Sequence, residues 1–178
     1  MRVVISPFVF FFLLSENEVL MIVATLLYLI GAVTDFLDGF LARKLKVVSS
    51  FGTFLDPLAD KFLNCAAFIA FAIMGIASVW MVIVIILRDI ITTYMRIIAD
   101  SIGSPLVTSK TAKWKTFLQM VYICGVLLII LIDSSTSSRY NLMATLQPVL
   151  DWTLLALTLL TVWSMTEYII KNKKIFVK

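Results

Sequence analysis

The sequence has no histidine, only two cysteines and few charged residues. Aspartate, glutamate, lysine and arginine together make up 15% of its 178 residues. Without histidine, acid–base chemistry and metal binding fall to carboxylates, hydroxyls and lysines. Cys65 and Cys124 both lie inside apolar runs, which argues against a disulfide framework and indicates small core residues.

Apolar runs take the place of the missing polar residues. The chain is 61% hydrophobic, with a mean hydropathy of +1.04. Runs of about 20 apolar residues match the length that spans a bilayer. This composition excludes an ordinary soluble domain and predicts an all-α, polytopic membrane protein in contact with the lipid bilayer. The net charge of +4 does not indicate nucleic-acid binding, because the basic residues sit at the ends of apolar runs, where they meet lipid head groups.

About six transmembrane helices are predicted, in a single domain over residues 1–178. They cover residues 1–14, 19–43, 53–74, 79–100, 108–132 and 147–170. Most separators are short, so consecutive helices should be antiparallel neighbours. The first segment is too short: its residues give about 21 Å of helix, against a hydrocarbon core of about 30 Å. It is therefore expected to be interfacial or re-entrant, or to continue upstream of residue 1.

Charge placement predicts the orientation of the bundle. One set of helix ends carries Arg2, Arg43, Lys44, Lys46, Lys110, Lys113, Lys115, Lys171, Lys173, Lys174 and Lys178. The opposite set carries Arg139 with Glu16, Glu18, Asp133 and Asp151. By the positive-inside rule, both termini face the cytoplasm, in a bacterial cytoplasmic membrane. Lys115 and the lysines of residues 171–178 are expected to anchor in the head groups.

Four aspartates stand out in this charge-poor chain. Asp35 and Asp38 are three positions apart and Asp56 and Asp60 are four apart, so each pair shares one helix face. An ionised carboxylate at membrane depth costs about 2.5 to 3.5 kcal/mol, so the cluster needs neutralising. Two divalent cations would cancel the four charges. Hard oxygen ligands suit Mg²⁺ or Mn²⁺ better than zinc.

Small residues and one arginine are interleaved with the aspartates. Gly39, Ala42 and Gly52 would let a bulky diphosphate approach the backbone. The alternative for them, and above all for Ala42, is close helix packing. Arg43 lies about two turns after Asp35 and is suited to holding a phosphate. Its alternative role is an anchor whose side chain reaches the membrane interface.

These positions together form the pattern D-x(2)-D-G-x(2)-A-R-x(8)-G-x(3)-D-x(3)-D. The pattern resembles the signature of the CDP-alcohol phosphotransferase family, which are integral membrane enzymes of phospholipid synthesis. The resemblance implies that an alcohol attacks the phosphorus of a CDP-linked lipid and that CMP leaves. It also implies a homodimer. By that resemblance, the metal ligands are Asp35, Asp38, Asp56 and Asp60, with Asp60 also the general base, and the CDP-lipid is bound by Asp35, Gly39, Ala42, Arg43 and Gly52.

Basic residues outside the signature indicate the acceptor. Arg88 and Arg96 are eight positions apart on one predicted helix and so lean into one groove, and Lys113 lies on the next helix. A basic pocket of Arg88, Arg96 and Lys113 suits an acceptor that carries its own phosphate. The alternative for Arg88 is a local ion pair with Asp89.

Longer stretches resemble one branch of the family, the one whose acceptor is sn-glycerol 3-phosphate. They are FGTFLDPLADKFLN with Pro57 and Lys61, residues 88–96, KWKTFLQM and EYIIKNKKIFV. The implied reaction joins CDP-diacylglycerol and sn-glycerol 3-phosphate to give phosphatidylglycerophosphate and CMP. Ala112 departs from the glycine common in this branch, and the residues usually found upstream of Arg2 are absent.

Other functions stay open at this point. Within the family, the acceptor is phosphatidylglycerol in cardiolipin synthases, and an inositol phosphate in other synthases. A cation-coupled transporter also places aspartates inside a helical bundle. Transporters more often show broken helices and carboxylates spread along a path, whereas here the carboxylates gather at one end.

Overall fold

The structure is a computed structural model that describes residues 2–15, 17–45, 50–101, 110–135 and 142–176. Within these ranges, the side chains of 35–45, 50–60, 100–101, 110, 112–113, 134–135 and 173–176 lie outside the described part. The secondary structure of the described residues is helical throughout. The helices are α1 (Arg2–Leu13), α2 (Glu18–Leu45), α3 (Ser50–Ile73), α4 (Val79–Ser101), α5 (Lys110–Ser135) and α6 (Leu142–Phe176).

Local sequence signals set several of these helix ends. Asn17 precedes α2, and its Oδ1 accepts a hydrogen bond from the N–H of Val19 at 2.9 Å, as an N-cap does. Helix α3 ends at Gly75, which has a φ of 75°. The N–H of Ile76 donates to the carbonyl of Phe71 at 2.9 Å, so the end is a Schellman motif in which glycine supplies the left-handed residue. The chain then turns directly into α4.

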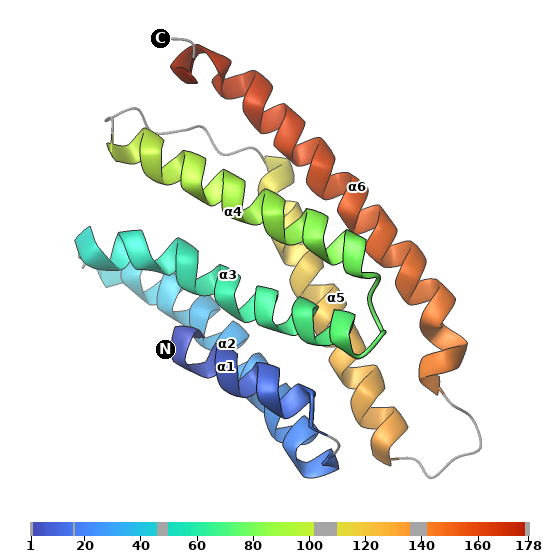
Figure 1. Ribbon diagram of the computed structural model, residues 1–178. Coiled ribbons are helices and arrows are strands. Elements are labelled where there is room, and N and C mark those ends of the chain that lie inside the picture. Colours follow the sequence, from blue (N-terminus) through green and yellow to red (C-terminus); the bar gives the residue numbers. More distant parts are fainter. Residues whose placement is uncertain (1, 16, 46–49, 102–109, 136–141, 177–178) are drawn as a thin grey trace.

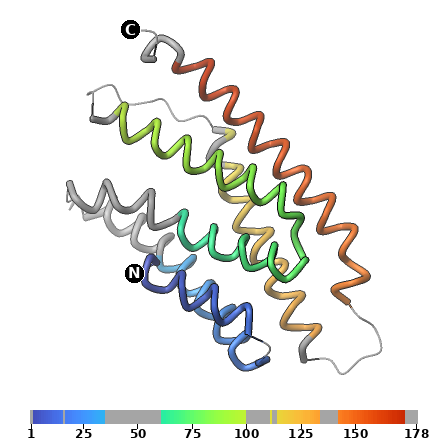
Figure 2. The backbone as a smooth tube through the Cα atoms, viewed as in Figure 1, coloured from blue at the N-terminus to red at the C-terminus, as the bar shows by residue number. Residues whose placement is uncertain are grey.

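The six helices form one bundle (Figure 1). Helix α3 packs against α4, α4 against α6, α6 against α5, and α5 against both α2 and α3, while α1 lies on α2 and α3. Helix α6 is the longest and runs along one side of the bundle (Figure 2). The first and last helices both have their chain termini at the left-hand end of the view in Figure 1. The C-terminal end of α2, the N-terminal end of α3 and the C-terminal end of α4 lie at the same end.

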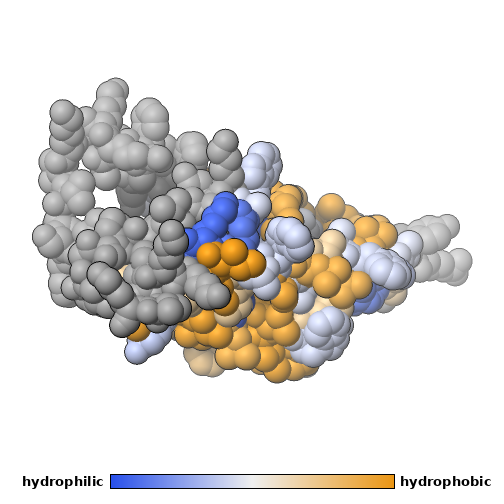
Figure 3. Space-filling view, turned by 90° about the horizontal axis from the view of Figure 1, so that it is seen from above, coloured by the Kyte–Doolittle hydropathy of each residue, from blue (hydrophilic) through white to orange (hydrophobic). Residues whose placement is uncertain are grey.

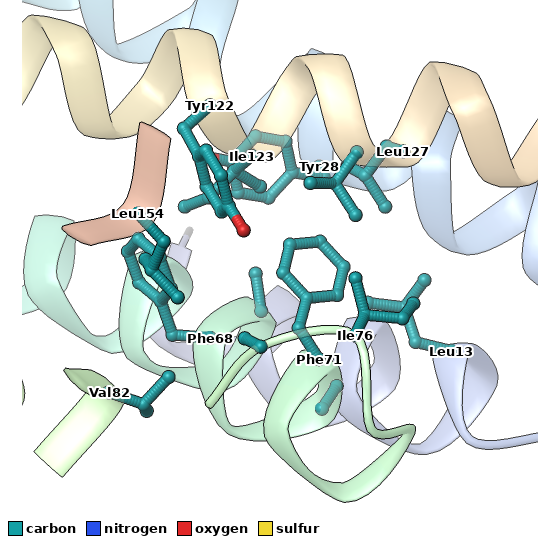
Figure 4. Close-up of a cluster of buried hydrophobic side chains, with 14 of the residues drawn as sticks. Leu13, Tyr28, Phe68, Phe71, Ile76, Val82, Tyr122, Ile123, Leu127 and Leu154 are labelled. Carbon is teal, nitrogen blue, oxygen red and sulfur yellow. The ribbon is translucent and has the colours of Figure 1, made fainter. Parts of the chain in front are cut away.

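The hydrophobic core fills the half of the bundle near the α3–α4 turn. Figure 4 shows aromatic and aliphatic side chains from several helices meeting there. Phe68 of α3 stacks on Tyr122 of α5 with ring centroids 6.0 Å apart. Tyr28 of α2 is fully buried and donates a hydrogen bond to Oδ1 of Asn64 at 2.9 Å. These contacts lock α2, α3 and α5 together.

Large hydrophobic side chains also cover the outside of the bundle. Trp152, Trp163 and Ile170 of α6 are each more than two thirds exposed, and hydrophobic residues cover much of the described surface in Figure 3. Two described segments, Trp114–Asp133 and Leu142–Asn172, are long and apolar enough to span a membrane. Shorter apolar helical segments lie at Arg2–Leu13, Glu18–Thr34 and Lys61–Ile73. The outer surface is that of a helical bundle in a membrane.

The predicted helices agree with the observed ones in number and order. The largest difference is in the last helix, which was expected at 147–170 and extends over Leu142–Phe176. It continues past the apolar stretch into the lysine-rich end, since lysine and glutamate are good helix formers. Cys65 and Cys124 are free and half-buried, as expected for cysteines that form no disulfide.

Candidate active site

The predicted metal-binding residues lie on two helices that are joined by a short connection. Asp35, Asp38, Gly39, Ala42 and Arg43 belong to the C-terminal part of α2, and Gly52, Asp56 and Asp60 to the N-terminal part of α3. The side chains of all eight lie outside the described part of the chain. Their convergence on a metal therefore stays a prediction. Elsewhere among the described side chains, no group of three or more histidine, cysteine, aspartate or glutamate residues forms a metal site.

A buried ionic network begins one residue after Asp60. We call it the Asp89 network, and its members are Lys61 of α3, Arg88, Asp89 and Thr92 of α4, Lys115 of α5 and Ser164 of α6. Asp89 pairs with Arg88 at 3.2 Å and also with Lys115. Lys61 Nζ donates to the Asp89 carbonyl oxygen at 3.1 Å. Asp89 thus links α3, α4 and α5, and the hydrogen bond from Arg88 to Ser164 adds α6.

The Arg88 guanidinium is held on three sides. Its NH1 nitrogen contacts the Asp89 carboxylate and the Thr92 hydroxyl, at 3.2 and 3.4 Å. Its NH2 nitrogen donates to Ser164 Oγ at 2.6 Å. The residue is 6% exposed, and its Nε has no hydrogen-bond partner among the described atoms. The local pair with Asp89 is therefore present, and the Nε–H of the guanidinium remains unused.

The ion pair of Asp89 and Lys115 crosses a wide separation. In the described part of the chain, no Cα of α4 lies within 8 Å of a Cα of α5. The long lysine side chain closes this distance. Lys115 is 1% exposed, so the expectation that it anchors in lipid head groups is wrong. Its charge is stabilised by a buried partner on another helix, which spacing along its own helix does not reveal.

The other two predicted acceptor residues are less fully described. Arg96 lies two turns after Arg88 on α4 and is half-buried, and its Nε has no partner among the described residues. Lys113 is on α5, with its side chain outside the described part. The structure thus places Arg88 and Arg96 on one helix near the α3 aspartates. A common pocket with Lys113 stays a prediction.

Sequence reasoning did not assign four of these residues to a site. Lys61, Asp89, Lys115 and Ser164 meet around Arg88. One available signal was their chemistry, since ionisable residues within apolar helices usually face the bundle interior and pair with one another. Ser164 carried no such signal, because hydroxyl residues are common in membrane helices and usually bond their own backbone.

A second polar contact joins the start of α5 to α6. Thr111 Oγ1 donates to Glu167 Oε2 at 2.5 Å, and Lys171 Nζ contacts the other carboxylate oxygen of Glu167 at 2.5 Å. Because Lys171 is half-exposed, this pair contributes little to stability by charge alone. It fixes the α5 end that carries Lys113 and Lys115 beside α6.

An apolar groove runs beside the Asp89 network. It has a volume of about 750 Å³ and lies between α1, α3 and α4. Phe10, Phe62, Ile69 and Ile90 are among the residues that line it, and Lys61 supplies its charged group. An apolar wall with one ammonium group suits a molecule with a long hydrocarbon part and an anionic head.

Comparison with known proteins identifies the family. Residues 1–164 match the CDP-alcohol phosphatidyltransferase family. The chain belongs to this family. The match agrees with the signature over residues 35–60. It favours a phosphatidyltransferase over the alternative of a cation-coupled transporter. The family consists of phosphatidyltransferases that use divalent cations, and the apolar exterior of this chain is that of a membrane enzyme.

Several bacterial relatives share the name CDP-diacylglycerol–glycerol-3-phosphate 3-phosphatidyltransferase. The Haemophilus influenzae protein is 34% identical over 94% of this chain and 86% of its own length. The Bacillus subtilis protein is 42% identical over 58% of this chain, and the match spans about half, 53%, of that relative. The Rickettsia typhi protein is 29% identical over 92% of this chain and 89% of its own length.

Proposed function

We propose that this enzyme transfers the phosphatidyl group of CDP-diacylglycerol to sn-glycerol 3-phosphate, giving phosphatidylglycerophosphate and CMP. The observation that carries the proposal is the excess of positive charge in the Asp89 network. Among the described side chains, Arg88 and Lys115 pair with the Asp89 carboxylate, and Lys61, the residue after Asp60, donates to the Asp89 backbone carbonyl. A buried excess of cations is costly unless an anion joins it, and the phosphate of the acceptor is such an anion. The names of the relatives support the same acceptor.

The predicted donor set fits two divalent cations, Mg²⁺ or Mn²⁺. Asp35 and Asp38 would supply carboxylates from α2, and Asp56 and Asp60 from α3. The described side chains near the start of α3 add the amide of Asn64, the thiol of Cys65 and the ammonium of Lys61. Of these, Cys65 is half-buried and Lys61 already bonds a backbone carbonyl. Hard oxygen ligands without histidine favour these cations over zinc.

The reaction is a displacement at the phosphorus next to the lipid. When bound, the cations polarise the diphosphate and stabilise the charge that develops on CMP. Asp60 takes the proton of the acceptor hydroxyl as its oxygen forms the new bond to phosphorus. The phosphorus–oxygen bond to CMP breaks at the same time. Arg43 holds a phosphate of the CDP-lipid, and Gly39, Ala42 and Gly52 leave room for the diphosphate beside the backbone.

The basic residues beyond the signature bind the acceptor. These residues are Arg88 and Arg96 of α4 and Lys113 of α5. Their positive charges attract the negatively charged phosphate of sn-glycerol 3-phosphate. The unused Nε–H groups of Arg88 and Arg96 are suited to this role, because a buried donor without an acceptor is unfavourable. The apolar groove beside Lys61 suits a hydrocarbon chain of a lipid substrate.

The enzyme works as a homodimer in the bacterial cytoplasmic membrane, with its active site on the cytoplasmic side. The basic residues at one set of helix ends support this orientation. The cytoplasm is also where a water-soluble acceptor with a phosphate is available.

A CMP-release assay with a panel of acceptors tests the function. Purified enzyme in mixed micelles receives CDP-diacylglycerol and Mg²⁺ or Mn²⁺. We expect CMP release to require sn-glycerol 3-phosphate and to fall to background with phosphatidylglycerol, serine, inositol or inositol phosphate. A chelator should abolish release, and added metal should restore it. Release with phosphatidylglycerol or inositol phosphate in place of sn-glycerol 3-phosphate would assign the enzyme to another branch of the family.

A further inference from the structure

The conformation of Arg88 depends on groups from two helices. Asp89 and Thr92 hold NH1 from within α4, and Ser164 holds NH2 from α6. These three contacts fix the plane of the guanidinium and therefore the direction of its unused Nε–H. Arginine side chains have several rotatable bonds, and holding one in a single conformation costs rotamer entropy when nothing else fixes it.

Asp89 is itself fixed by residues of other helices. Lys115 of α5 pairs with its carboxylate, and Lys61 of α3 donates to its backbone carbonyl. The carboxylate is 13% exposed, so water does little to replace these contacts. Through Asp89, the positions of α3 and α5 therefore determine the position of the Arg88 guanidinium.

We propose that Asp89 is a positioning residue for the acceptor, acting through Arg88, with Ser164 as a second support for the same guanidinium. The inference rests on the proposed function, since it takes Arg88 as a ligand of the acceptor phosphate. Asp89 makes no contact with the acceptor. Its carboxylate presets the arginine, so that binding of the phosphate does not have to order it.

The proposal predicts a selective effect on acceptor binding. Asp89→Asn removes the charge from a hydrogen bond to a charged partner, and Ser164→Ala removes a neutral acceptor from the same guanidinium. On the usual strengths of such bonds, we expect the KM for sn-glycerol 3-phosphate to rise about 10-fold or more in Asp89→Asn and about threefold to tenfold in Ser164→Ala. The KM for CDP-diacylglycerol should change by less than about twofold, which is the scatter expected for a substitution that does not interact with that substrate.

A double-mutant cycle separates positioning from a general loss of structure. In an Arg88→Ala background, neither Asp89→Asn nor Ser164→Ala should raise the acceptor KM further, because the residue through which both act is gone. The control is Gln147→Met. Gln147 Nε2 donates to the Ile76 carbonyl at 2.9 Å, and its Cα lies about 26 Å from that of Ser164 along α6. This variant should lower the thermal unfolding temperature and leave the acceptor KM unchanged.

The outcomes are distinct. If Asp89→Asn and Ser164→Ala raise the KM of both substrates equally, or still raise the acceptor KM in the Arg88→Ala background, the positioning role is wrong. If Asp89→Asn fails to fold in detergent, Ser164→Ala and its cycle with Arg88→Ala decide the question alone. Should the wild-type enzyme release no CMP with sn-glycerol 3-phosphate, the proposed function itself fails. Normal release combined with unchanged variants overturns only the role of Asp89.

Discussion

Charged side chains in this bundle differ in whether their removal should lower the stability of the fold, the activity, or both. Asp89 is buried and compensates two cations directly, so it serves both the fold and the orientation of Arg88. Under the proposed function, the signature aspartates serve the chemistry, and bound divalent cations would balance their charges. A substitution at Asp89 therefore has to be judged on stability and on substrate constants together, whereas one at Asp60 tests the reaction itself.

Asp60→Asn should abolish turnover and leave the protein folded. Asparagine has nearly the same size as aspartate but does not accept the proton of the acceptor hydroxyl, and loss of a general base costs about 100-fold or more. The measurement is CMP release at saturating substrates, together with thermal unfolding in detergent. Asp151→Asn on α6 is the control that also removes one carboxylate, and its turnover should stay normal. Retained turnover in Asp60→Asn would exclude Asp60 as the base.

Arg96→Ala should weaken the acceptor and spare the lipid substrate. A charged hydrogen bond to phosphate is worth about 1.5 to 3 kcal/mol, so the KM for sn-glycerol 3-phosphate should rise about 10-fold or more. Arg96→Lys keeps the charge without the planar donor group, so its KM for sn-glycerol 3-phosphate should lie between those of the wild type and Arg96→Ala. Initial rates with each substrate varied in turn give both constants. A loss confined to the CDP-lipid constant would place Arg96 at the other substrate.

At the residue scale, residue types and spacing identified the family correctly, whereas the prediction for Lys115 was wrong because its partner lies on another helix. The four aspartates of residues 35–60 are visible as a pattern, and the family match agrees with that pattern. Lys115 was placed at the lipid surface from its position two residues after Lys113. Its burial depends on Asp89, 26 residues earlier in the chain, and no periodicity within α5 reports that contact.

At the scale of elements, close packing of α2 on α3 depends on Gly31. A Cβ at this position would lie 3.0 Å from Leu63 Cδ2 and 3.8 Å from Arg2 Cγ. Gly125 in α5 is the matched control, since a Cβ there has no described neighbour within 4 Å. Both substitutions to alanine gain about 1 kcal/mol of helix propensity, but only Gly31→Ala has to displace a neighbour, at a cost of about 1 to 3 kcal/mol.

Thermal unfolding in detergent should therefore rank Gly125→Ala above Gly31→Ala, with Gly125→Ala at or above the wild type. Equal unfolding temperatures for the two variants would mean that Leu63 moves aside without cost. The close approach would then be no constraint on the packing of α2 and α3.

The number and order of the helices were predictable because the lengths of the apolar runs can be read from the sequence. The ends of the helices were less predictable. The start of α6 was expected at residue 147, yet the helix begins at Leu142. Pro148 lies inside this helix, where it lacks one backbone hydrogen bond, and the side chain of Gln147 donates to the Ile76 carbonyl at the α3–α4 turn. Tertiary contacts of this kind extend helices beyond their hydropathy.

At the scale of the whole molecule, we expect the six helices to place both termini on one side of a membrane. We expect green fluorescent protein fused after Lys178 to fluoresce in the bacterial cytoplasm. Alkaline phosphatase fused within residues 136–141, between α5 and α6, should be active on the outer side. Because the basic residues lie at the ends that share the side of the termini, this result follows from the positive-inside rule. The opposite pattern would invert the proposed orientation of the active site.

The pairing of Asp89 with Lys115 also bears on biosynthesis. Asp89 leaves the ribosome before Lys115, so the counter-ion of a lysine that would otherwise enter the bilayer unpaired is already present when α5 joins the nascent bundle. A protein synthesised as two fragments, 1–105 and 106–178, would have to find this partner after translation. We expect co-expressed fragments to recover CMP release when Asp89 is retained and to recover far less with Asp89→Asn. The ion pair would thus act as the recognition element between two independently inserted pieces.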